Sequence, residues 1–310
     1  GHDVTLFSGS TPAVLTGGVQ IAPNGWAALE SLGLAESARA VSLRLNDITV
    51  RALDSGVTLI RLPLDAPYAS FDRAALAGLF DTALSATPGL SRHSANLRHI
   101  HQQPAGVTLI TDDGASHCAT GLIAADGGGG AGRHHVASNG SAGVLQRKVA
   151  MRAQVPLDSL PAHFALASSN LWLGRGVHVV HYPIGAMLNL VVTMPASRVV
   201  DGWQQRVIPA TSPLAVLANA DITWVRTPLA MAEASSCWRR GRVVLAGDAA
   251  HSMPPHLAQG AGQGLQDAAS LAHHLASADD IEAAFAGYVR ERAGDVSRIV
   301  QKADVSGKII

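Results

Sequence analysis

A chain of 310 residues, 47% of them hydrophobic, can bury one large α/β core or two smaller ones. Its 23 basic and 23 acidic residues balance, so no net charge draws the chain to nucleic acid or to an anionic membrane. The two cysteines, Cys118 and Cys237, lie outside any C-x-x-C spacing, which argues against a disulfide framework or a thiolate metal site. No apolar stretch is long enough to span a bilayer, and we expect a cytoplasmic protein with a small-molecule partner.

The 14 histidines form no metal-binding motif. They are scattered, and the pairs His134/His135 and His273/His274 are adjacent in sequence. Neighbouring side chains on a helix or a strand point in different directions and do not converge on one ion. We therefore expect no metal site.

The first elements are a short strand, a helix and a hairpin. Residues 2–7 read as a strand, and residues 23–34 predict a helix with Asn24 as its N-cap. Two alternating segments, 45–53 and 57–64, flank the turn "DSG" and predict a β-hairpin.

A second helix and further strands follow. Residues 73–86 predict the helix, and residues 106–127 predict strands, the last of which carries Asp126 at its end. From about residue 143 to 230 the pattern changes, because 148–155, 177–184 and 187–194 read as strands of one antiparallel sheet. The chain ends with a long amphipathic helix. This last helix is expected over residues 280–304.

The stretch "GDAAHSMPPHLAQGAGQGLQDAASLAHHL", residues 247–275, combines four glycines and two prolines with acidic residues and several histidines. It follows a buried-looking strand at 242–246 and leads into an Ala/Leu-rich helix. Glycine allows a positive φ or a close backbone approach, and proline stiffens the loop between. The pattern indicates that a ligand lies against this backbone.

Three segments in this order resemble a known family: "GGVQIAPNGWAALESLGL" (17–34), "GLIAADG" (121–127) and "GDAAHSMPPHLAQGAGQGLQDA" (247–268). Together they resemble the FAD-dependent aromatic hydroxylases of the p-hydroxybenzoate hydroxylase fold. The likeness is strongest to the branch that contains salicylate, hydroxybenzoate and hydroxynicotinate hydroxylases.

The resemblance implies an α/β fold, with a Rossmann-like FAD-binding domain and an inserted antiparallel-sheet substrate domain. The first domain would comprise residues 1–142 and 231–310, and the substrate domain residues 143–230. The implied partners are a small aromatic substrate, O₂, FAD, and NADH or NADPH as cosubstrate. A homodimer is compatible with the sequence without being required by it.

Cofactor-binding residues follow from the same resemblance. Asp248 would accept hydrogen bonds from the ribityl hydroxyls, although an acid there also reads as a helix cap. Asp126 would contact FAD and NAD(P)H, or else belong to an ordinary strand-end turn. Arg73 would lie near the FAD pyrophosphate, or be a solvated residue of a first helical turn. The implied cofactor residues are Ser8, Arg73, Asp126, Gly127, Gly247, Asp248, Pro254, Gly260, Ala261 and Gly262.

The sequence departs from the family pattern in three places. The family begins with a strand, G-x-G-x-x-G and a helix before a strand like residues 2–7, and this unit is missing here. Ser8 stands where the family usually has a Glu that holds the adenosine ribose, and "GGGG" (127–130) replaces bulkier residues. The chain also ends at "SGKII", short of the family's usual C-terminal helix region. We therefore expect either part of a longer protein, truncated at both ends, or a remnant that binds FAD weakly.

The chemistry implied by the resemblance is hydroxylation of an aromatic ring. NAD(P)H reduces FAD, O₂ adds at flavin C4a, and the resulting C4a-hydroperoxyflavin delivers one oxygen atom. A base that deprotonates a phenol would assist, and the strand 177–184 offers His178 and Tyr182 on one face and His181 on the other. Alternation alone does not decide between the two histidines, and an exposed sheet surface is the competing interpretation.

Two further functions stay open at this point. An alkene epoxidase or a quinone-ring hydroxylase of the same fold would share every FAD residue named above. A non-catalytic or incomplete fragment with weak FAD binding would explain the missing G-x-G-x-x-G unit and Ser8, whereas the intact 247–268 segment argues against it.

Overall fold

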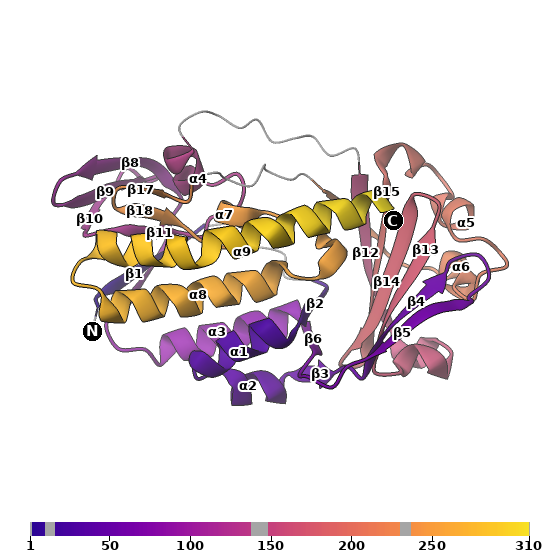
Figure 1. Cartoon of the computed structure of the whole chain (residues 1–310). Coiled ribbons are helices and arrows are strands. Elements are labelled where there is room, and N and C mark those ends of the chain that lie inside the picture. Colours follow the sequence, from indigo (N-terminus) through magenta and orange to yellow (C-terminus); the bar gives the residue numbers. More distant parts are fainter. Residues whose placement is uncertain (1, 10–15, 138–147, 230–236, 310) are drawn as a thin grey trace.

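The computed structural model describes residues 2–9, 16–137, 148–229 and 237–309. A broad seven-stranded sheet stands at one end of the molecule, and helices with several smaller sheets form the other end (Figure 1). The strands of the broad sheet, in spatial order, are β16 (Val225–Pro228), β12 (Lys148–Pro156), β15 (Met187–Pro195), β14 (Val177–Ile184), β13 (Ser168–Gly174), β4 (Asp47–Ala52) and β5 (Thr58–Pro63).

The antiparallel sheet and the hairpin are both confirmed as elements. Strands β12, β15 and β14 pair antiparallel, and β4 pairs antiparallel with β5. The hairpin joins the broad sheet through a parallel pairing of β4 with β13, so this sheet also draws strands from the range 1–142. The domain boundaries expected at 142/143 and 230/231 lie outside the described residues.

The other end of the molecule contains short sheets with parallel pairings. Strand β1 (Val4–Ser8) pairs parallel with β7 (Leu90–Ser94), and β11 (Leu122–Ala124) pairs parallel with β18 (Val243–Leu245). Parallel strands joined through helices are the arrangement expected of a Rossmann-like domain. The remaining strands there are β17 (Arg239–Arg240), β2 (Gly18–Ile21), β6 (Ala69–Asp72), β3 (Ser42–Arg44), β8 (Leu97–Gln103), β9 (Gly106–Thr111) and β10 (Ser116–Ala119).

Two long helices, α8 (Gly260–Ser277) and α9 (Ile281–Ile309), pack side by side along the molecule, and α9 reaches the broad sheet (Figure 1). Gly287 permits this close packing, because a Cβ there would lie 2.5 Å from the His274 ring. The other helices are α1 (Pro23–Ser31), α2 (Ala35–Ala40), α3 (Arg73–Ser85), α4 (Ala131–Val136), α5 (Trp203–Val207), α6 (Ala215–Asn219) and α7 (Asp248–His251), with 3₁₀ turns η1 (Leu157–Ser159), η2 (Ala162–Ala165), η3 (Ala196–Arg198) and η4 (Pro255–Leu257).

The predicted capping of α1 is wrong. The N-cap is Ala22 and makes no side-chain cap, whereas Pro23 starts the helix. Proline is well suited to that position because its missing N–H would have no helical partner. Asn24 instead points its amide toward α8, so tertiary contacts use the side chain that local sequence assigned to capping.

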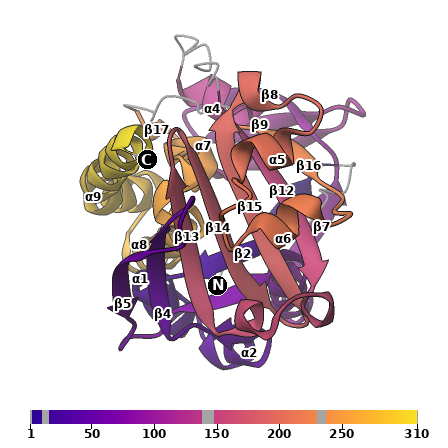
Figure 2. The same ribbon diagram turned by 90° about the vertical axis from the view of Figure 1, so that its right-hand side faces the viewer.

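The two faces of the broad sheet differ in what covers them. The outer face carries an apolar core that includes Val179, Leu190 and Trp172, and α5 and α6 lie over it (Figure 2). The inner face meets the end of the molecule that contains the long helices, where Tyr182 packs with Ala22 and other residues. Because side chains alternate along a strand, each strand contributes to both faces. The inner-face residues on β14, β15 and β12 are His178, Val180, Tyr182, Asn189, Val191, Thr193, Ala150, Arg152 and Gln154.

Candidate functional site

Two predicted motifs meet at the carboxyl ends of adjacent parallel strands. Ala124 is paired with Leu245, and the backbone N–H of Ala246 donates to the carbonyl of Ala124 at 2.9 Å. Asp126 and Gly127 therefore leave one strand beside the point where Gly247 and Asp248 leave the other. Ligands of open α/β sheets bind at such carboxyl ends.

Gly247 and Asp248 form a turn with an available acceptor. Gly247 has φ +57°, and a Cβ there would meet nothing within 4 Å. Asp248 begins α7 as an exposed residue, and its carboxylate makes no hydrogen bond or ion pair with the described residues. The bond that a helix-capping role requires is not formed, and the carboxylate stays able to accept bonds from a ligand.

Asp126 is already engaged by the loop that follows it. Its Oδ2 accepts the backbone N–H of Gly132 at 2.8 Å. A Cβ on Gly130 would lie 2.0 to 2.3 Å from the Asp126 carboxyl atoms, and one on Gly132 would lie 2.2 Å from Ala124 Cβ. Close approach thus explains part of the glycine-rich loop. The hydrogen bond from the loop to Asp126 is what the strand-end-turn interpretation expects. The contact between Asp126 and the cofactor stays a prediction.

Arg133 supports the candidate site, and the sequence reasoning did not predict this. Its side chain is buried, and Nη1 donates to the carbonyl of Ala249 at 2.7 Å, which ties α4 to α7. Burial lowers the pKa of the guanidinium. The only sequence signal was an arginine a few residues after the Asp-Gly pair.

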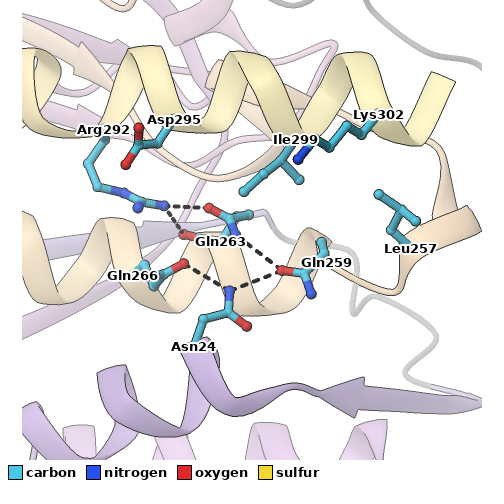
Figure 3. A pocket seen from close by; sticks show the side chains of 9 residues that line it. All are labelled: Asn24, Leu257, Gln259, Gln263, Gln266, Arg292, Asp295, Ile299 and Lys302. Carbon is cyan, nitrogen blue, oxygen red and sulfur yellow. Dashed lines mark hydrogen bonds between the residues drawn. The ribbon is translucent and has the colours of Figure 1, made fainter. Parts of the chain in front are cut away.

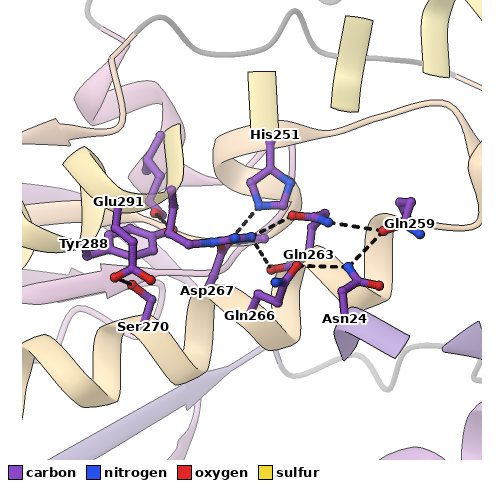
Figure 4. A network of polar contacts seen from close by, with 12 residues as sticks. Asn24, His251, Gln259, Gln263, Gln266, Asp267, Ser270, Tyr288 and Glu291 are labelled. Carbon is purple, nitrogen blue, oxygen red and sulfur yellow. Dashed lines mark hydrogen bonds and ion pairs between the residues drawn. The ribbon is translucent and has the colours of Figure 1, made fainter. Parts of the chain in front are cut away.

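A buried ionic network holds the turn against α8 and α9 (Figure 4). Asp267 on α8 accepts from His251 Nε2 at 2.5 Å, from Arg292 Nε at 3.0 Å and from the backbone N–H of Gly247 at 2.9 Å. Burial alone would raise the pKa of Asp267, but the hydrogen bond from His251, the backbone N–H and Arg292 hold it below its usual value. A paired, fully bonded charge of this kind positions the backbone rather than the ligand.

The glycines at the start of α8 allow close packing. A Cβ on Gly260 would meet nothing within 4 Å, whereas Gly262 lies so close to α1 that a Cβ on Gly25 would be 3.1 Å from its Cα. Gly264 approaches Gly247, because a Cβ on Gly264 would lie 3.9 Å from the Gly247 Cα. The positive end of an 18-residue helix therefore lies beside the strand-end turn. Ala261 is the half-buried second residue of this helix.

A pocket of about 490 Å³ lies between α1, α8, α9 and η4 (Figure 3). Asn24 Nδ2 donates to Gln259 Oε1 at 3.0 Å and to Gln266 Oε1 at 2.9 Å, and Arg292 donates to Gln263 Oε1 at 2.7 Å. These side chains join the three helices next to the beginning of α8. The lining residues are Asn24, Leu257, Gln259, Gln263, Gln266, Arg292, Asp295, Ile299 and Lys302.

The broad sheet meets the 247–268 segment at His178. Its ring lies edge-on to the ring of His256 in η4, with centroids 4.9 Å apart. Burial, with smaller contributions from His256 and Lys148, lowers the pKa of His178 to about 3. Pro254, which precedes η4, is buried in the same loop. His178 is therefore a neutral imidazole at physiological pH, facing the segment that carries the cofactor motif.

Tyr182 lies on the same face, at the other end of β14. A Cβ on Gly18 would lie 2.9 Å from Tyr182 Oη, so the glycine permits the β2 loop to pack on the sheet. The Gly18 N–H donates to Asn189 Oδ1 at 2.7 Å. Burial raises the pKa of Tyr182 well above its usual range, and the phenol stays protonated.

His181 is on the outer face and is not brought together with His178 and Tyr182. Its ring lies 5.2 Å from that of Phe164 and 6.1 Å from that of Trp172. Neither ring nitrogen has a hydrogen-bond partner among the described residues, and burial lowers the pKa of His181 to about 3. The structure thus separates two histidines between which alternation could not decide.

Ser8 and Arg73 lie on elements other than the two strands that form the strand-end turn. Ser8 is exposed at the end of β1, opposite Ser94. Arg73 is the exposed first residue of α3. Its backbone N–H donates to the carbonyl of Gly17 at 3.0 Å, which places the start of α3 beside the residue that precedes β2. Their proposed roles toward the cofactor stay predictions.

The residues present fit FAD. A ribityl pyrophosphate needs backbone that can be approached closely, an acceptor for hydroxyl groups and a positive helix end. Gly127, Gly247 and Gly260 offer open space, Asp248 offers an exposed acceptor, and α8 begins beside them. Within the described ranges, no group of three or more His, Cys, Asp or Glu residues is placed to hold a metal ion. The described helices include none with the length and apolar character of a membrane span.

Comparisons with known proteins show the family of this chain. A family model described as an FAD binding domain matches residues 76–303. The 3-amino-4-hydroxybenzoate 2-monooxygenase PtmB3 of Streptomyces platensis is 34% identical over 306 residues, covering 90% of this chain and 75% of that protein. A 3-hydroxybenzoate 6-hydroxylase of Klebsiella oxytoca is 30% identical over 313 residues, covering 94% and 78%.

The fold itself is found among solved structures. HpxO of Klebsiella pneumoniae, solved with FAD and uric acid, matches with a TM-score of 0.87 at 23% identity, covering 98% of this chain and 81% of that one. The family match, the two relatives and the cofactor-compatible turn point to one assignment. The chain belongs to the FAD-dependent aromatic hydroxylases, which are flavin monooxygenases of the p-hydroxybenzoate hydroxylase fold.

Proposed function

We propose that this enzyme hydroxylates a phenolic aromatic carboxylic acid and that His178 is the base that accepts the phenol proton. The observation that carries the proposal is the junction of His178 with His256, where the inner face of the substrate sheet meets the loop between Asp248 and α8. The two relatives named above act on hydroxylated benzoates, which supports this substrate class.

The protein has three tasks in such a reaction. It must hold the aromatic ring, keep water away from it and remove the phenol proton, because the phenolate ring is more electron-rich than the phenol ring. FAD, when bound, supplies the electron transfer from NAD(P)H and the activation of O₂. Asp248, Gly247 and the first turn of α8 would hold it.

His178 is neutral and can accept a proton at a ring nitrogen, but burial gives it a pKa of about 3, so it can hold the phenol proton only while the phenolate formed beside it stabilises the imidazolium. Its neighbour His256 is also buried in part, and burial together with Lys148 lowers the pKa of His256. The His256 Nδ1 atom is buried and has no partner among the described residues. Tyr182, held protonated by burial, can donate a hydrogen bond but does not compete for the proton.

The deciding experiment measures cofactor content and coupled turnover. The chain is purified without added cofactor, released FAD is quantified per protein, and NADH and NADPH consumption is followed with a panel of hydroxylated benzoates. Retained FAD and formation of a product with one added oxygen support the proposal. A chain that never binds FAD supports the non-catalytic fragment, and oxygen transfer to alkenes or quinones alone supports an epoxidase or a quinone-ring hydroxylase.

Location and assembly are proposals of the same kind. We place the enzyme in a reducing cytoplasm, because Cys118 and Cys237 are both exposed and the described residues contain no disulfide. We propose a homodimer, to be checked by light scattering on the purified chain.

A further inference from the structure

Arg152 lies on the inner face of the substrate sheet, in line with the proposed catalytic residues. It pairs with Val191 on β15, which in turn pairs with Val180 on β14. Val180 lies between His178 and Tyr182 on the same face of β14. The guanidinium therefore shares a surface with both side chains, separated from β14 by one strand.

The charge of Arg152 has no counterion in the described part of the chain, where it forms no ion pair and no hydrogen bond. Burial, together with the positive charge of Arg73, lowers the pKa of the Arg152 guanidinium, while Tyr182 opposes this effect. Asp72 does not compensate, since its Oδ1 caps α3 and its Oδ2 accepts from Gln154 Nε2 at 3.3 Å. A partly buried cation beside a second cation is an arrangement that an anionic ligand would stabilise.

The surroundings specify the kind of anion. Val180 and Val191 form an apolar surface on which an aromatic ring can lie, between a cation on β12 and an imidazole on β14. Strands two positions apart are separated by about 10 Å, which leaves room for one ring between the two side chains. A guanidinium matches a carboxylate through two parallel hydrogen bonds.

We propose that Arg152 binds the carboxylate of the substrate and thereby selects aromatic acids over neutral phenols. This rests on the proposed function, because it assumes that the ring lies on the inner face with its hydroxyl at His178. Arg73, the first residue of α3, adds to the positive potential around Arg152, whereas the direct contact with the carboxylate is assigned to Arg152 alone.

The test compares a charged probe with a neutral one of the same shape. Binding of 3-hydroxybenzoate and 3-hydroxybenzamide to the FAD-loaded chain is measured by calorimetry and by the change in flavin absorbance. The variants are Arg152→Gln, Arg152→Lys and, as a control, Arg226→Gln on β16. Arg226 pairs with Met151, next to Arg152 in sequence, and so lies on the opposite face.

We expect wild-type protein to prefer the acid and Arg152→Gln to weaken acid binding by about 10- to 100-fold, as for a lost charged hydrogen bond. Amide binding should change by less than about threefold, Arg152→Lys should retain part of the preference, and Arg226→Gln should change neither.

Three results would overturn the proposal. Equal binding of acid and amide by wild-type protein, with hydroxylation of both, leaves the proposed function intact and removes the role of Arg152. Loss of FAD in Arg152→Gln with unchanged preference for the acid assigns the arginine to the cofactor. A wild-type chain that holds FAD but binds neither probe contradicts both proposals.

Discussion

The buried ionisable groups around Asp267 have partners, whereas Arg152 and His178 on the inner face of the sheet form no ion pair with the described residues. Asp267, His251 and Arg292 satisfy one another between α7, α8 and α9. On the inner face, Arg152 and His178 make no ion pair with the described residues, although burial lowers the pKa of each. Burial of a charge is costly unless it is paired. The paired network therefore supports the fold, whereas the unpaired groups indicate where a ligand belongs.

Breaking the paired network should have the largest effect. Asp267→Asn leaves Arg292 buried without its carboxylate partner and removes a charged acceptor of the Gly247 N–H. We expect a loss of about 3–5 kcal/mol in the free energy of unfolding, measured by urea denaturation. Asp295→Asn, which breaks the exposed pair with Arg298 on α9, should cost at most about 1 kcal/mol. Similar losses for the two variants would contradict a supporting role for Asp267.

Replacing the unpaired histidine should affect turnover instead of folding. For His178→Gln we expect a loss of about 10²- to 10⁴-fold in kcat, the range for removal of a general base, with FAD content unchanged. A substrate with a more acidic phenol should recover part of the rate, because it needs less help in losing its proton. His99→Gln, on the exposed surface of β8, serves as the control. An equal loss with every phenol would argue for a purely structural role.

Asp248 combines features of the two regions. It follows Gly247, which is held by Asp267, but its own carboxylate makes no hydrogen bond or ion pair with the described residues. Asp248→Ala should weaken FAD binding by about 10- to 100-fold through loss of charged hydrogen bonds. Its unfolding free energy should shift by less than about 0.5 kcal/mol, because the side chain is exposed. Equilibrium dialysis against FAD measures the first quantity, with Asp201→Asn in a remote exposed turn as the control. Unchanged FAD affinity would rule out the assigned contact.

His181 gives the smallest expected effect and the clearest pH signature. Its pKa is about 3 in the folded protein against the ordinary 6.5, so the unfolded chain binds more protons between these values. Stability should therefore fall as pH drops from 6.5 toward 3. His181→Leu should reduce this acid-induced loss and, by removing unpaired buried nitrogens, stabilise the protein at pH 7 by about 1 kcal/mol. Urea midpoints at pH 7 and pH 5 measure both effects, and an unchanged pH slope would exclude them.

Local patterns predicted most of the elements that carry the site. The strand over 177–184 and the glycine-rich turn at 247 were readable because alternation, glycine and proline act over a few residues. Asn24 shows where this reasoning stops. Asparagine is favoured as a helix N-cap, but the Asn24 side chain instead donates to the amide oxygens of Gln259 and Gln266, more than 230 residues away in sequence.

By itself, the sequence determined the family, the order of the elements and the faces of β14, since these depend on short-range spacing and on motifs. Only the tertiary structure decided which face meets the cofactor segment, and thus that His178 and not His181 lies against His256. It also decided that Asp267 is paired and that Arg152 has no ion pair among the described residues. The physical reason is that burial and charge pairing depend on contacts between distant segments, which no local pattern encodes.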